Sequence, residues 1–329
     1  MRIFSKPSPR VLFMGTPDFA LPSLEALVEH AAAGKVWATG LDLIGVVTRP
    51  DKPAGRGRKV AFSPVKQYAV AKGMDIFQPG PLRREDALKQ VTALAPDLII
   101  VAAFGQILPT AILELPPHCC LNVHASLLPR HRGAAPISAA ILAGDAETGV
   151  TIMLMEEGLD TGPILARCAM PIAPDDTTGT LTTKLATLGA ELLLAALPEW
   201  LAGGLVPQPQ DEALATLTRP IRREDCLLDW TKPAEEVGRQ VRAYSPRPGA
   251  FTRWDGHQVK ILQAYPVEAG SAADLPPGRC ALDAATGKLL CACGQGALAL
   301  GVIQLEGKRA LPAVDVLRGH PALATATFT

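Results

Sequence analysis

Asn122 and His124 stand two positions apart in a short run, from Cys119 to His124, in which polar and apolar side chains alternate. Successive side chains of an extended strand point to opposite faces, so we expect Asn122 and His124 on the same face. The run ends where the chain enters a loop, and open α/β sheets place their ligand crevices outside the carboxyl ends of their strands. The spacing therefore predicts an amide donor and an imidazole that project together into a crevice.

The residues after this run predict a main-chain edge beside that crevice. Pro129 disfavours the helical region for Leu128 and removes one backbone donor, so we expect Ser126 to Pro129 to be stiff and extended. Such an edge offers main-chain donors and acceptors to a flat heterocycle. A carboxylate, Asp160, follows in the turn Gly158-Leu159-Asp160-Thr161-Gly162. Taken singly, the Asn-x-His pair could be a structural pair and Asp160 a turn former.

Together these residues resemble a known family. The pattern N-x-H-x-S-L-L-P-x-x-x-G over residues 122–133, followed by L-D-x-G, is similar to the signature of the 10-formyltetrahydrofolate-dependent formyltransferases. The resemblance implies the family's fold, a folate donor of the formyl group, and catalytic roles for Asn122, His124 and Asp160. The sequence departs from the pattern at Ala125, where the family usually has glycine. The added methyl group fits if the backbone keeps a negative φ there.

Length, charge and cysteine content limit the class of protein. At 329 residues the chain is too long for one ordinary core, so we expect two domains. The 32 basic and 32 acidic residues balance, so no overall field draws the protein to nucleic acid or membrane. We expect no signal peptide and no membrane span. Seven cysteines without a C-x-x-C pair favour reduced thiols over a zinc site. We therefore expect a cytoplasmic protein that holds no metal, and we expect a monomer.

The N-terminal part of the chain alternates between apolar runs and helical patterns, which predicts a Rossmann-like, mostly parallel α/β sheet domain. The first strand, Val11 to Met14, leads into Gly15-Thr16-Pro17-Asp18, but no G-x-G-x-x-G is present, which disfavours a bound dinucleotide. Residues 31–40 resemble an added loop. Further strands are expected at 41–48, 75–77, 97–103, 119–124, 149–155 and 164–170. Helices are expected at 19–30, 83–95, 136–143 and 178–200.

The stretch from Arg49 to Lys59 is strongly basic, with Asp51 as its single acid. Its prolines and glycines argue against a helix or a strand ladder, so on its own it could be a solvated loop. P-D-K-P-A-G-R-G-R-K, followed by Ser63-Pro64-Val65-Lys66, resembles the loop characteristic of the methionyl-tRNA formyltransferases. The resemblance implies that this loop enters the acceptor end of the initiator tRNA, where an arginine fork suits phosphate. The implied tRNA-binding residues are Arg56, Lys52 and Arg58.

The same resemblance assigns the folate to two loops. Residues 104–109 follow the apolar strand 97–103, and on their own they would be a plain connection above the core. In the family the corresponding loop forms the wall of the pterin pocket, largely through backbone groups. The implied folate-binding residues are Ser126, Leu127, Leu128, Pro129, Phe104, Gly105, Ile107 and Leu108.

Residues 205–220 lack a hydrophobic period and are expected to link a catalytic domain at 1–204 to a C-terminal domain at 221–329. A short helix at 233–243 and strand-like runs at 249–254, 258–265, 278–283, 289–293 and 297–304 predict a small, OB-like β-barrel. The resemblance implies that this part forms a second tRNA-binding surface. On their own, such barrels can also serve as lids, and a surface of mixed charge can simply be solvated. The basic residues here are Arg219, Arg222, Arg223, Lys232, Arg239, Arg242, Arg247 and Arg253.

The reaction that the resemblance implies is transfer of a formyl group from 10-formyltetrahydrofolate to the α-amino group of methionyl initiator tRNA, giving N-formylmethionyl-tRNA for translation initiation. An amine attacking this carbon passes through a tetrahedral species with an oxyanion and an ammonium, which needs hydrogen-bond donors and a route for the proton. Asn122 can donate to the oxygen, and His124 can donate best when protonated. Asp160 could hold His124 in that state and accept the amine's proton through water. No covalent enzyme intermediate is required.

Three other functions stay open at this point. A formyltransferase for a small amine, such as a sugar nucleotide, is disfavoured by the loop at 53–57 and by the C-terminal barrel. A hydrolase that releases formate from the same folate would turn over without an acceptor. An RNA-binding protein with a vestigial folate pocket would show no turnover.

Overall fold

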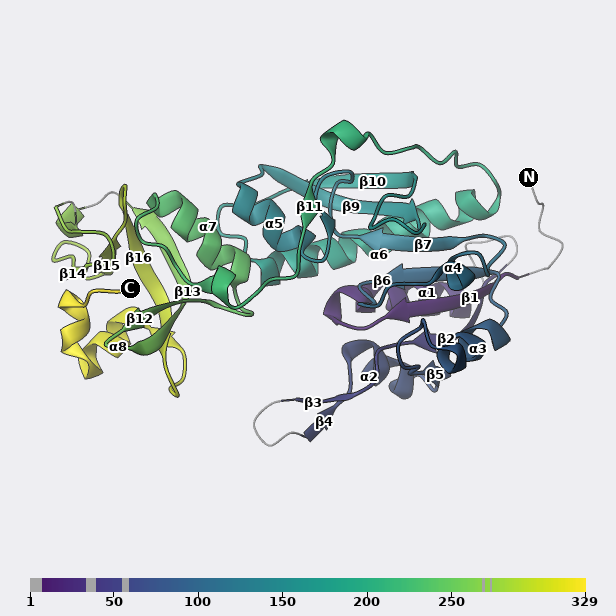
Figure 1. The fold of residues 1–329 in the computed structure, drawn as a ribbon, viewed down its shortest axis with the longest axis horizontal. Helices are drawn as coiled ribbons and strands as arrows, with labels where there is room; N and C mark the ends of the chain where they lie inside the picture. Colours follow the sequence, from purple (N-terminus) through teal and green to yellow (C-terminus); the bar gives the residue numbers. More distant parts are fainter. Residues whose placement is uncertain (1–7, 34–39, 55–58, 268–269, 273) are drawn as a thin grey trace. The chain divides into compact units, whose positions relative to one another are not determined.

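The structure, a computed structural model, describes residues 8–33, 40–54, 59–267, 270–272 and 274–329. The chain forms two compact units (Figure 1). The first consists of residues 1–136, 147–170 and 182–218, and the second of residues 137–146, 171–181 and 219–329. Both units are therefore discontinuous in sequence, unlike the simple division into catalytic domain, linker and barrel that the sequence predicts.

A seven-stranded sheet forms the centre of the first unit, with strand order β10-β9-β7-β6-β1-β2-β5. Its strands are β1 (Arg10–Gly15), β2 (Asp42–Val47), β5 (Ile76–Phe77), β6 (Leu98–Ala102), β7 (Cys120–His124), β9 (Glu147–Leu154) and β10 (Ile164–Pro171). Neighbouring strands from β5 to β7 pair in parallel, and β9 is antiparallel to β7. The predicted Rossmann-like sheet is confirmed, since the parallel strands follow the doubly wound order that reverses direction at β1.

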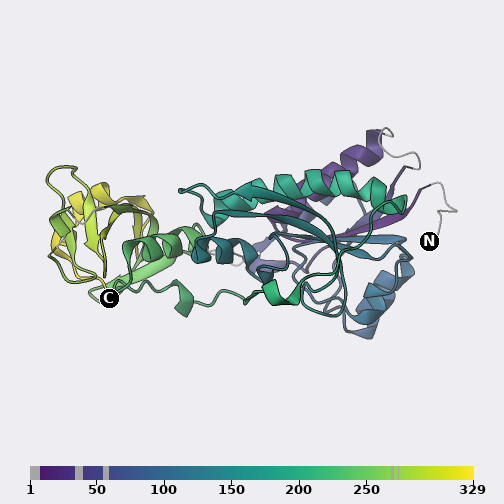
Figure 2. The same ribbon diagram turned by 90° about the horizontal axis from the view of Figure 1, so that it is seen from above.

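Helices cover both faces of this sheet (Figure 2). One face carries α1 (Leu21–Ala33) and α6 (Thr178–Leu201), and the other carries α3 (Glu85–Ala93) with α4 (Thr110–Leu113). α2 (Pro64–Ala71) begins after Ser63, whose hydroxyl accepts a hydrogen bond from the backbone amide of Lys66. Gly189 lets α6 approach the sheet closely, because an added Cβ would lie 2.8 Å from Cγ1 of Val123.

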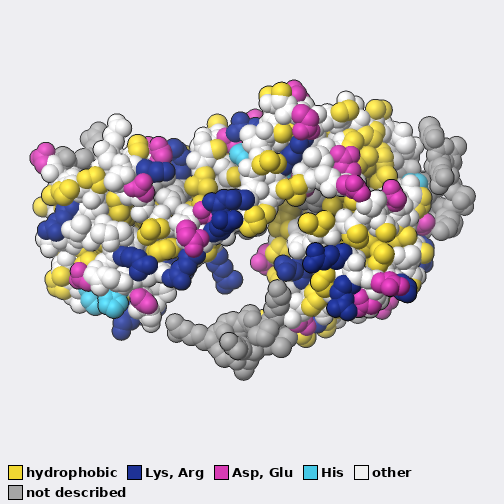
Figure 3. Space-filling model, in the orientation of Figure 1, with side chains coloured by type: hydrophobic (Ala, Val, Ile, Leu, Met, Phe, Trp, Pro, Cys, Tyr) yellow, Lys and Arg dark blue, Asp and Glu magenta, His cyan; other side chains and the backbone are white. Residues whose placement is uncertain are grey.

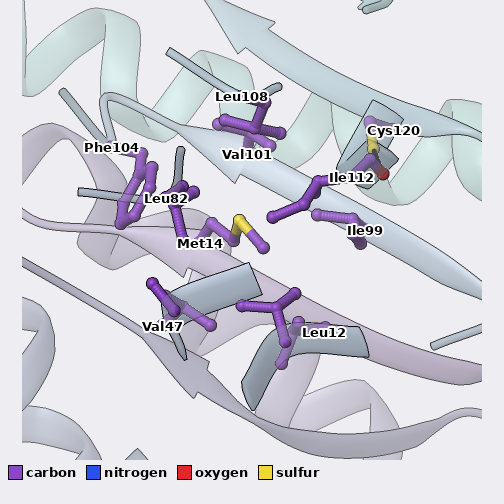
Figure 4. Close-up of a cluster of buried hydrophobic side chains, with 12 residues drawn as sticks. Leu12, Met14, Val47, Leu82, Ile99, Val101, Phe104, Leu108, Ile112 and Cys120 are labelled. Carbon is purple, nitrogen blue, oxygen red and sulfur yellow. Dashed lines mark hydrogen bonds between the residues drawn. The ribbon is translucent and has the colours of Figure 1, made fainter. Parts of the chain in front are cut away.

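A buried apolar cluster lies between the sheet and the α3–α4 face (Figure 4). The strands contribute alternate residues, among them Leu12, Met14, Ile99 and Val101. Cys120 belongs to the same cluster, so Asn122 and His124 share this face of β7, since residues two apart in a strand point the same way. Val123 points to the opposite face, toward α6. The alternation predicted for this strand is thus confirmed.

α6 is long and apolar enough to cross a membrane by length and composition alone. The expectation that no segment reaches such a length is therefore too strict. The core helix of a globular protein passes the same test, and most leucines of α6 are buried in the fold. Those with no exposed surface include Leu185, Leu193 and Leu197.

A two-stranded hairpin, β3 (Lys52–Ala54) and β4 (Lys59–Ala61), extends from the first unit between β2 and α2 (Figure 1). The expectation that prolines and glycines exclude a ladder here is wrong, because Pro53 pairs with Val60. Each strand of such a hairpin has an open edge, and proline is tolerated where its missing N–H would face outward. Arg56 and Arg58 lie outside the described residues, and for Lys52 the structure describes only the backbone.

Residues 205–218, expected to be part of a linker, belong to the first unit, and we call them the polar strap. The strap contains β11 (Leu217–Thr218), which pairs in parallel with β8 (Arg132–Gly133). Gln208 and Ile164 also exchange two backbone hydrogen bonds of 2.8 Å. Hydrogen bonds hold the segment in place, and little of its apolar surface is buried. Its sequence therefore shows no hydrophobic period.

The second unit contains α5 (Pro136–Ala143, from residue 137 on), α7 (Ala234–Tyr244), α8 (Ala313–Gly319) and an antiparallel sheet with order β12-β13-β16-β15-β14. The strands are β12 (Ala250–Trp254), β13 (His257–Val267), β14 (Cys280–Leu282), β15 (Leu289–Ala292) and β16 (Ala297–Leu305), with β17 (Leu311–Pro312) paired to β16. All five strand-like runs predicted from the sequence are present as strands.

The C-terminal residues join the two ends of this sheet. Thr329 exchanges backbone hydrogen bonds of 2.8 and 3.0 Å with Arg253 of β12. On the other side, Cys280 of β14 donates to the carbonyl oxygen of Ala326 at 2.8 Å, and Phe328 donates to that of Gly278 at 2.8 Å. Residues 326–329 therefore close the strands into a small barrel, as the sequence predicts.

Candidate active site

Three polar side chains that are far apart in the sequence meet at β7. Nδ2 of Asn122 donates a hydrogen bond to Oδ1 of Asp160 at 3.4 Å, and Nδ1 of His124 lies 3.6 Å from Oδ2 of the same carboxylate. Asp160 belongs to the loop between β9 and β10. Asn122 and His124 are buried, and the side chain of Asp160 is 14% exposed. The structure thus brings the predicted trio together.

The loop holds Asp160 in an uncommon backbone conformation. Its φ is +54°, in the left-handed region that few non-glycine residues adopt. The backbone amide of Gly133 donates to Oδ2 of Asp160 at 2.8 Å. Gly133 has a φ of +112°, and a Cβ there would lie 2.3 Å from the carbonyl oxygen of Thr218. Glycine is therefore required where this chain segment passes between Asp160 and the polar strap.

Burial and a neighbouring carboxylate act on the pKa of His124 in opposite directions. Desolvation lowers the pKa of its imidazole below the ordinary value, although the Asp160 carboxylate opposes this effect. Nε2 lies 3.2 Å from the carbonyl oxygen of His131, which can only accept, so Nε2 carries the hydrogen of the neutral ring. Nδ1 then presents its lone pair toward Asp160. The role of Asp160 in keeping His124 protonated stays a prediction, since burial lowers the pKa of the ring while the carboxylate raises it.

The segment Ser126–Pro129 forms a buried turn, and the extended edge expected from the sequence is wrong. The hydroxyl of Thr151 donates to the carbonyl oxygen of Ser126 at 2.7 Å and accepts from the backbone amide of Leu128 at 3.1 Å. A side chain of β9 therefore uses main-chain groups that were expected to face a heterocycle. Of these four residues Leu127 is partly exposed, and the other three are buried.

The departure from the family pattern at Ala125 is accommodated. Ala125 is buried, and its φ stays outside the positive region. The methyl group therefore adds no backbone strain at this position.

The loop after β6 lies beside the loop that carries Asp160. Phe104 and Leu108 are buried in the core cluster, whereas Ile107 is 87% exposed and Gly105 is also exposed. The hydroxyl of Thr110, directly after this loop, donates to the carboxylate of Glu157, three residues before Asp160. The predicted folate-binding residues 104–108 therefore border the trio's loop and offer an exposed apolar side chain there.

The polar strap supplies contacts that the sequence did not predict. Oγ1 of Thr216 accepts from the backbone amide of His131 at 2.7 Å, and Oγ1 of Thr218 donates to the carbonyl oxygen of Arg132 at 3.0 Å. The Arg132 side chain is 3% exposed and forms two hydrogen bonds of 2.9 and 2.6 Å with Glu212, which raise its pKa. Isolated polar residues carry no period, so no pattern in the sequence could have placed them at the site.

Asp51 pairs with Lys66 and Gln78 next to the β3–β4 hairpin. Its carboxylate binds Nζ of Lys66 and accepts from Nε2 of Gln78 at 2.9 Å. The hydrogen bond from Lys66 holds the pKa of Asp51 below its ordinary value. Lys66 ends the Ser63-Pro64-Val65-Lys66 motif, so this motif anchors the hairpin that begins at Lys52, one of the predicted tRNA contacts.

The basic residues of the second unit lie among acidic ones on the face drawn in Figure 3. Arg219 pairs with Asp225 at 2.5 Å, and Arg223 donates to Gln258 at 3.1 Å. The guanidinium of Arg223 also lies 5.9 Å from the ring centre of Phe251. Some of the cations expected to grip tRNA therefore also stabilise the unit itself.

Across the part of the chain that the structure describes, no group of three or more His, Cys, Asp or Glu side chains is arranged to hold a metal ion. All seven cysteines are free thiols.

Comparison with protein families places both parts of the chain. Residues 10–197 match the family model described as formyl transferase, and residues 220–321 match the model of the formyl transferase C-terminal domain. A methionyl-tRNA formyltransferase of Roseiflexus sp. (strain RS-1) is 47% identical over 310 residues, covering 94% of this chain and 92% of the relative. One from Thiobacillus denitrificans is 48% identical over 318 residues, covering 97% and 98%.

Solved structures share the fold at low sequence identity. HypX from Aquifex aeolicus, in complex with tetrahydrofolic acid, matches with a TM-score of 0.62 and 20% identity over 94% of this chain and 47% of that chain. An N-formyltransferase from Helicobacter canadensis, in complex with folinic acid and dTDP-3-aminofucose, matches with a TM-score of 0.63 and 16% identity over 88% and 98%.

Proposed function

The chain belongs to the methionyl-tRNA formyltransferase family, and on that premise we propose that Asn122, His124 and Asp160 form the site at which it formylates methionyl-tRNA. The observation that carries the assignment is the convergence of the three side chains, with Asp160 within 3.6 Å of both partners. An amide, an imidazole and a carboxylate supply a donor for an oxyanion and acceptors for a proton, which is what amine attack on a formyl carbon requires.

The donor that we propose is 10-formyltetrahydrofolate, which supplies the electrophilic formyl carbon when bound. The loop at 104–108 suits a flat pterin, because exposed Ile107 and the exposed backbone at Gly105 border the loop of Asp160. Phe104 and Leu108 anchor that loop in the core. The turn formed by Ser126, Leu127, Leu128 and Pro129 would shape the wall of the pocket, with partly exposed Leu127 as the side chain best placed to touch the ligand.

Asn122 is the residue that we assign to the developing oxyanion. One hydrogen of its amide points to Asp160, and the second remains to donate to another oxygen. An amide donor needs no particular protonation state, so it serves over a wide pH range. Removing one donor of this kind lowers turnover by a factor of roughly 10² to 10³.

His124 and Asp160 are the pair that we assign to the proton of the attacking amine. The neutral ring directs the lone pair of Nδ1 toward Oδ2 of Asp160, so two acceptors face one another 3.6 Å apart. The neutral amine adds to the formyl carbon, and the ammonium of the resulting adduct can give its proton to either acceptor. An imidazolium formed in this way is stabilised by the carboxylate on one side and by the His131 carbonyl oxygen on the other. Collapse of the adduct then breaks the bond from the formyl carbon to N10, and tetrahydrofolate leaves with a proton on that nitrogen.

For the second substrate we propose the initiator form of methionyl-tRNA, held by Lys52, Arg56 and Arg58 of the β3–β4 hairpin. The formal charge of the whole chain is zero, so the affinity for phosphate must come from local clusters of cations. The anchoring of the hairpin through Asp51, Lys66 and Gln78 supports a defined direction for this basic arm. A monomer in the cytoplasm completes the proposal, and gel filtration tests the oligomeric state.

Formyl transfer measured with three acceptors, and without any acceptor, tests the proposal. We expect turnover with methionyl initiator tRNA, far less with methionyl elongator tRNA, and none with an amino sugar nucleotide or with no acceptor. Formate release without an acceptor would identify a hydrolase, and transfer to the amino sugar would identify a small-amine enzyme. Binding of tRNA without any turnover would reduce the protein to an RNA-binding role.

A further inference from the structure

Gln210, in the polar strap, binds the backbone at Asp160 and at Gly162, two residues further along the chain. Its Nε2 donates to the carbonyl oxygen of Asp160 at 2.8 Å and to that of Gly162 at 2.7 Å. We propose that Gln210 is the positioning residue for Asp160, because it holds the backbone carbonyl groups of Asp160 and Gly162, in the turn from which the carboxylate projects. This inference rests on the proposed function of Asp160 and assigns Gln210 no contact with substrate.

The orientation of the Gln210 amide is set by a buried cation. Oε1 accepts from Nε of Arg132 at 3.0 Å, and a guanidinium can only donate. The oxygen of the amide must therefore face Arg132, and the nitrogen must face the two carbonyl groups. Arg132 is itself held by Glu212, also from the strap, through bonds of 2.9 and 2.6 Å. The amide of Gln210 is thus a fixed link between the strap, Arg132 and the Asp160 turn.

Asp160 needs such a support because its turn is unfavourable by itself. A φ of +54° costs a non-glycine residue of the order of 1–3 kcal/mol and persists only where the surroundings impose it. The carboxylate must also stay within 3.4 Å of Asn122 and 3.6 Å of His124. Without the two bonds from Gln210 the turn can relax, and a shift of about 1 Å in a reacting group can lower a rate about 100-fold.

A matched pair of substitutions in the strap tests this role. Gln210→Met keeps the length of the side chain and removes all three hydrogen bonds. Gln208→Met is the control, because Gln208 is exposed and its side-chain amide donates to Val206 within the strap itself. We expect Gln210→Met to lower kcat about 10- to 100-fold, with the KM for tRNA and the Kd for tetrahydrofolate unchanged. Gln208→Met should match the wild type in all three.

A double-mutant cycle separates positioning from general support of the fold. If Gln210 acts through the carboxylate, Gln210→Met should cost little further activity in an Asp160→Asn background. An equal loss in both backgrounds, or wild-type kcat in Gln210→Met, would overturn the proposal. Gln210→Glu adds a second measure, since its carboxylate would repel the two carbonyl groups and should lower kcat at least as far. Absence of formylation by the wild-type protein would instead refute the proposed function.

Discussion

The backbone amide of Gly133 lies 2.8 Å from Oδ2 of Asp160, so a main-chain donor of β8 holds the carboxylate of the β9–β10 loop. Gly133 can make this contact because its φ is +112°, and because its missing Cβ leaves room for the carbonyl oxygen of Thr218. The geometry of the trio therefore depends on a residue that has no side chain.

Gly133→Ala should damage both stability and turnover. The new Cβ would lie 2.3 Å from the Thr218 oxygen, in a backbone region that alanine avoids, so we expect a loss of about 2–4 kcal/mol in the free energy of unfolding. Gly73→Ala is the control, since Gly73 also has a positive φ, +66°, but no atom within 4 Å of the added Cβ. Urea unfolding of both variants measures the difference. Equal losses would show that the contact with Thr218 is unimportant.

Asn122→Ala, His124→Ala and Asp160→Ala should each remove all but a small residue of formylation and leave the fold intact. For Asn122→Ala we expect kcat to fall by a factor of roughly 10² to 10³, since one oxyanion donor is lost. Cys120→Ala changes the same face of the same strand next to the core, and it should keep its turnover while losing some stability. Steady-state rates and circular dichroism provide the measurements. Near wild-type turnover of Asp160→Ala would refute the proton-transfer role.

His124 should make the fold less stable in mild acid. Burial lowers its pKa in the folded state, so below about pH 6.5 the unfolded chain binds the proton more readily, and the free energy of unfolding falls as the pH falls. One such group contributes at most about 1.4 kcal/mol per pH unit. His118, whose pKa burial also lowers, contributes with the same sign.

Urea unfolding at pH 7.5 and pH 5.5 measures this effect. His124→Gln should lose less stability between the two values than the wild type does. A steeper loss in His124→Gln would mean that Asp160 outweighs burial and keeps the ring charged.

Arg56→Ala should weaken the use of tRNA and spare the folate. We expect the KM for methionyl-tRNA to rise and its dependence on salt to flatten by about one unit in a log–log plot, since one phosphate contact is lost. The Kd for tetrahydrofolate should stay unchanged. Arg84→Ala removes an exposed arginine of the first unit, paired with Asp86, and serves as the control. An unchanged KM in Arg56→Ala would remove the hairpin from tRNA binding.

The sequence predicts best the parts of this fold that repeat a pattern. β1, β6 and β7 were predicted within two residues, because buried parallel strands are continuous or alternating apolar runs. Asn122 and His124 were placed on one face for the same reason. Short alternating runs separated by turns predict the strands of the barrel. The sequence of residues 326–329 has no such pattern, so it does not predict that these residues close the barrel.

The sequence predicts least well the parts that hydrogen bonds organise. Thr216, Thr218 and Gln210 were assigned to a linker because contacts between distant polar residues leave no period. The buried turn at Ser126–Pro129 was expected to be extended because Thr151, which binds its main chain, lies on another strand. A prediction from the conformational preference of each residue cannot take account of a hydrogen-bond partner on a distant strand before the fold is known.

The polar strap makes the working part of this protein more fragile than the body beneath it. Leu214 and Leu217 are 60% and 76% exposed, so little buried apolar surface stabilises the strap. Hydrogen bonds provide most of its attachment to the rest of the unit. Segments of this kind detach at a lower free-energy cost than the global transition. In a denaturant titration, formylation activity should therefore be lost reversibly at a lower denaturant concentration than helical ellipticity. The central sheet would still be intact when activity is lost.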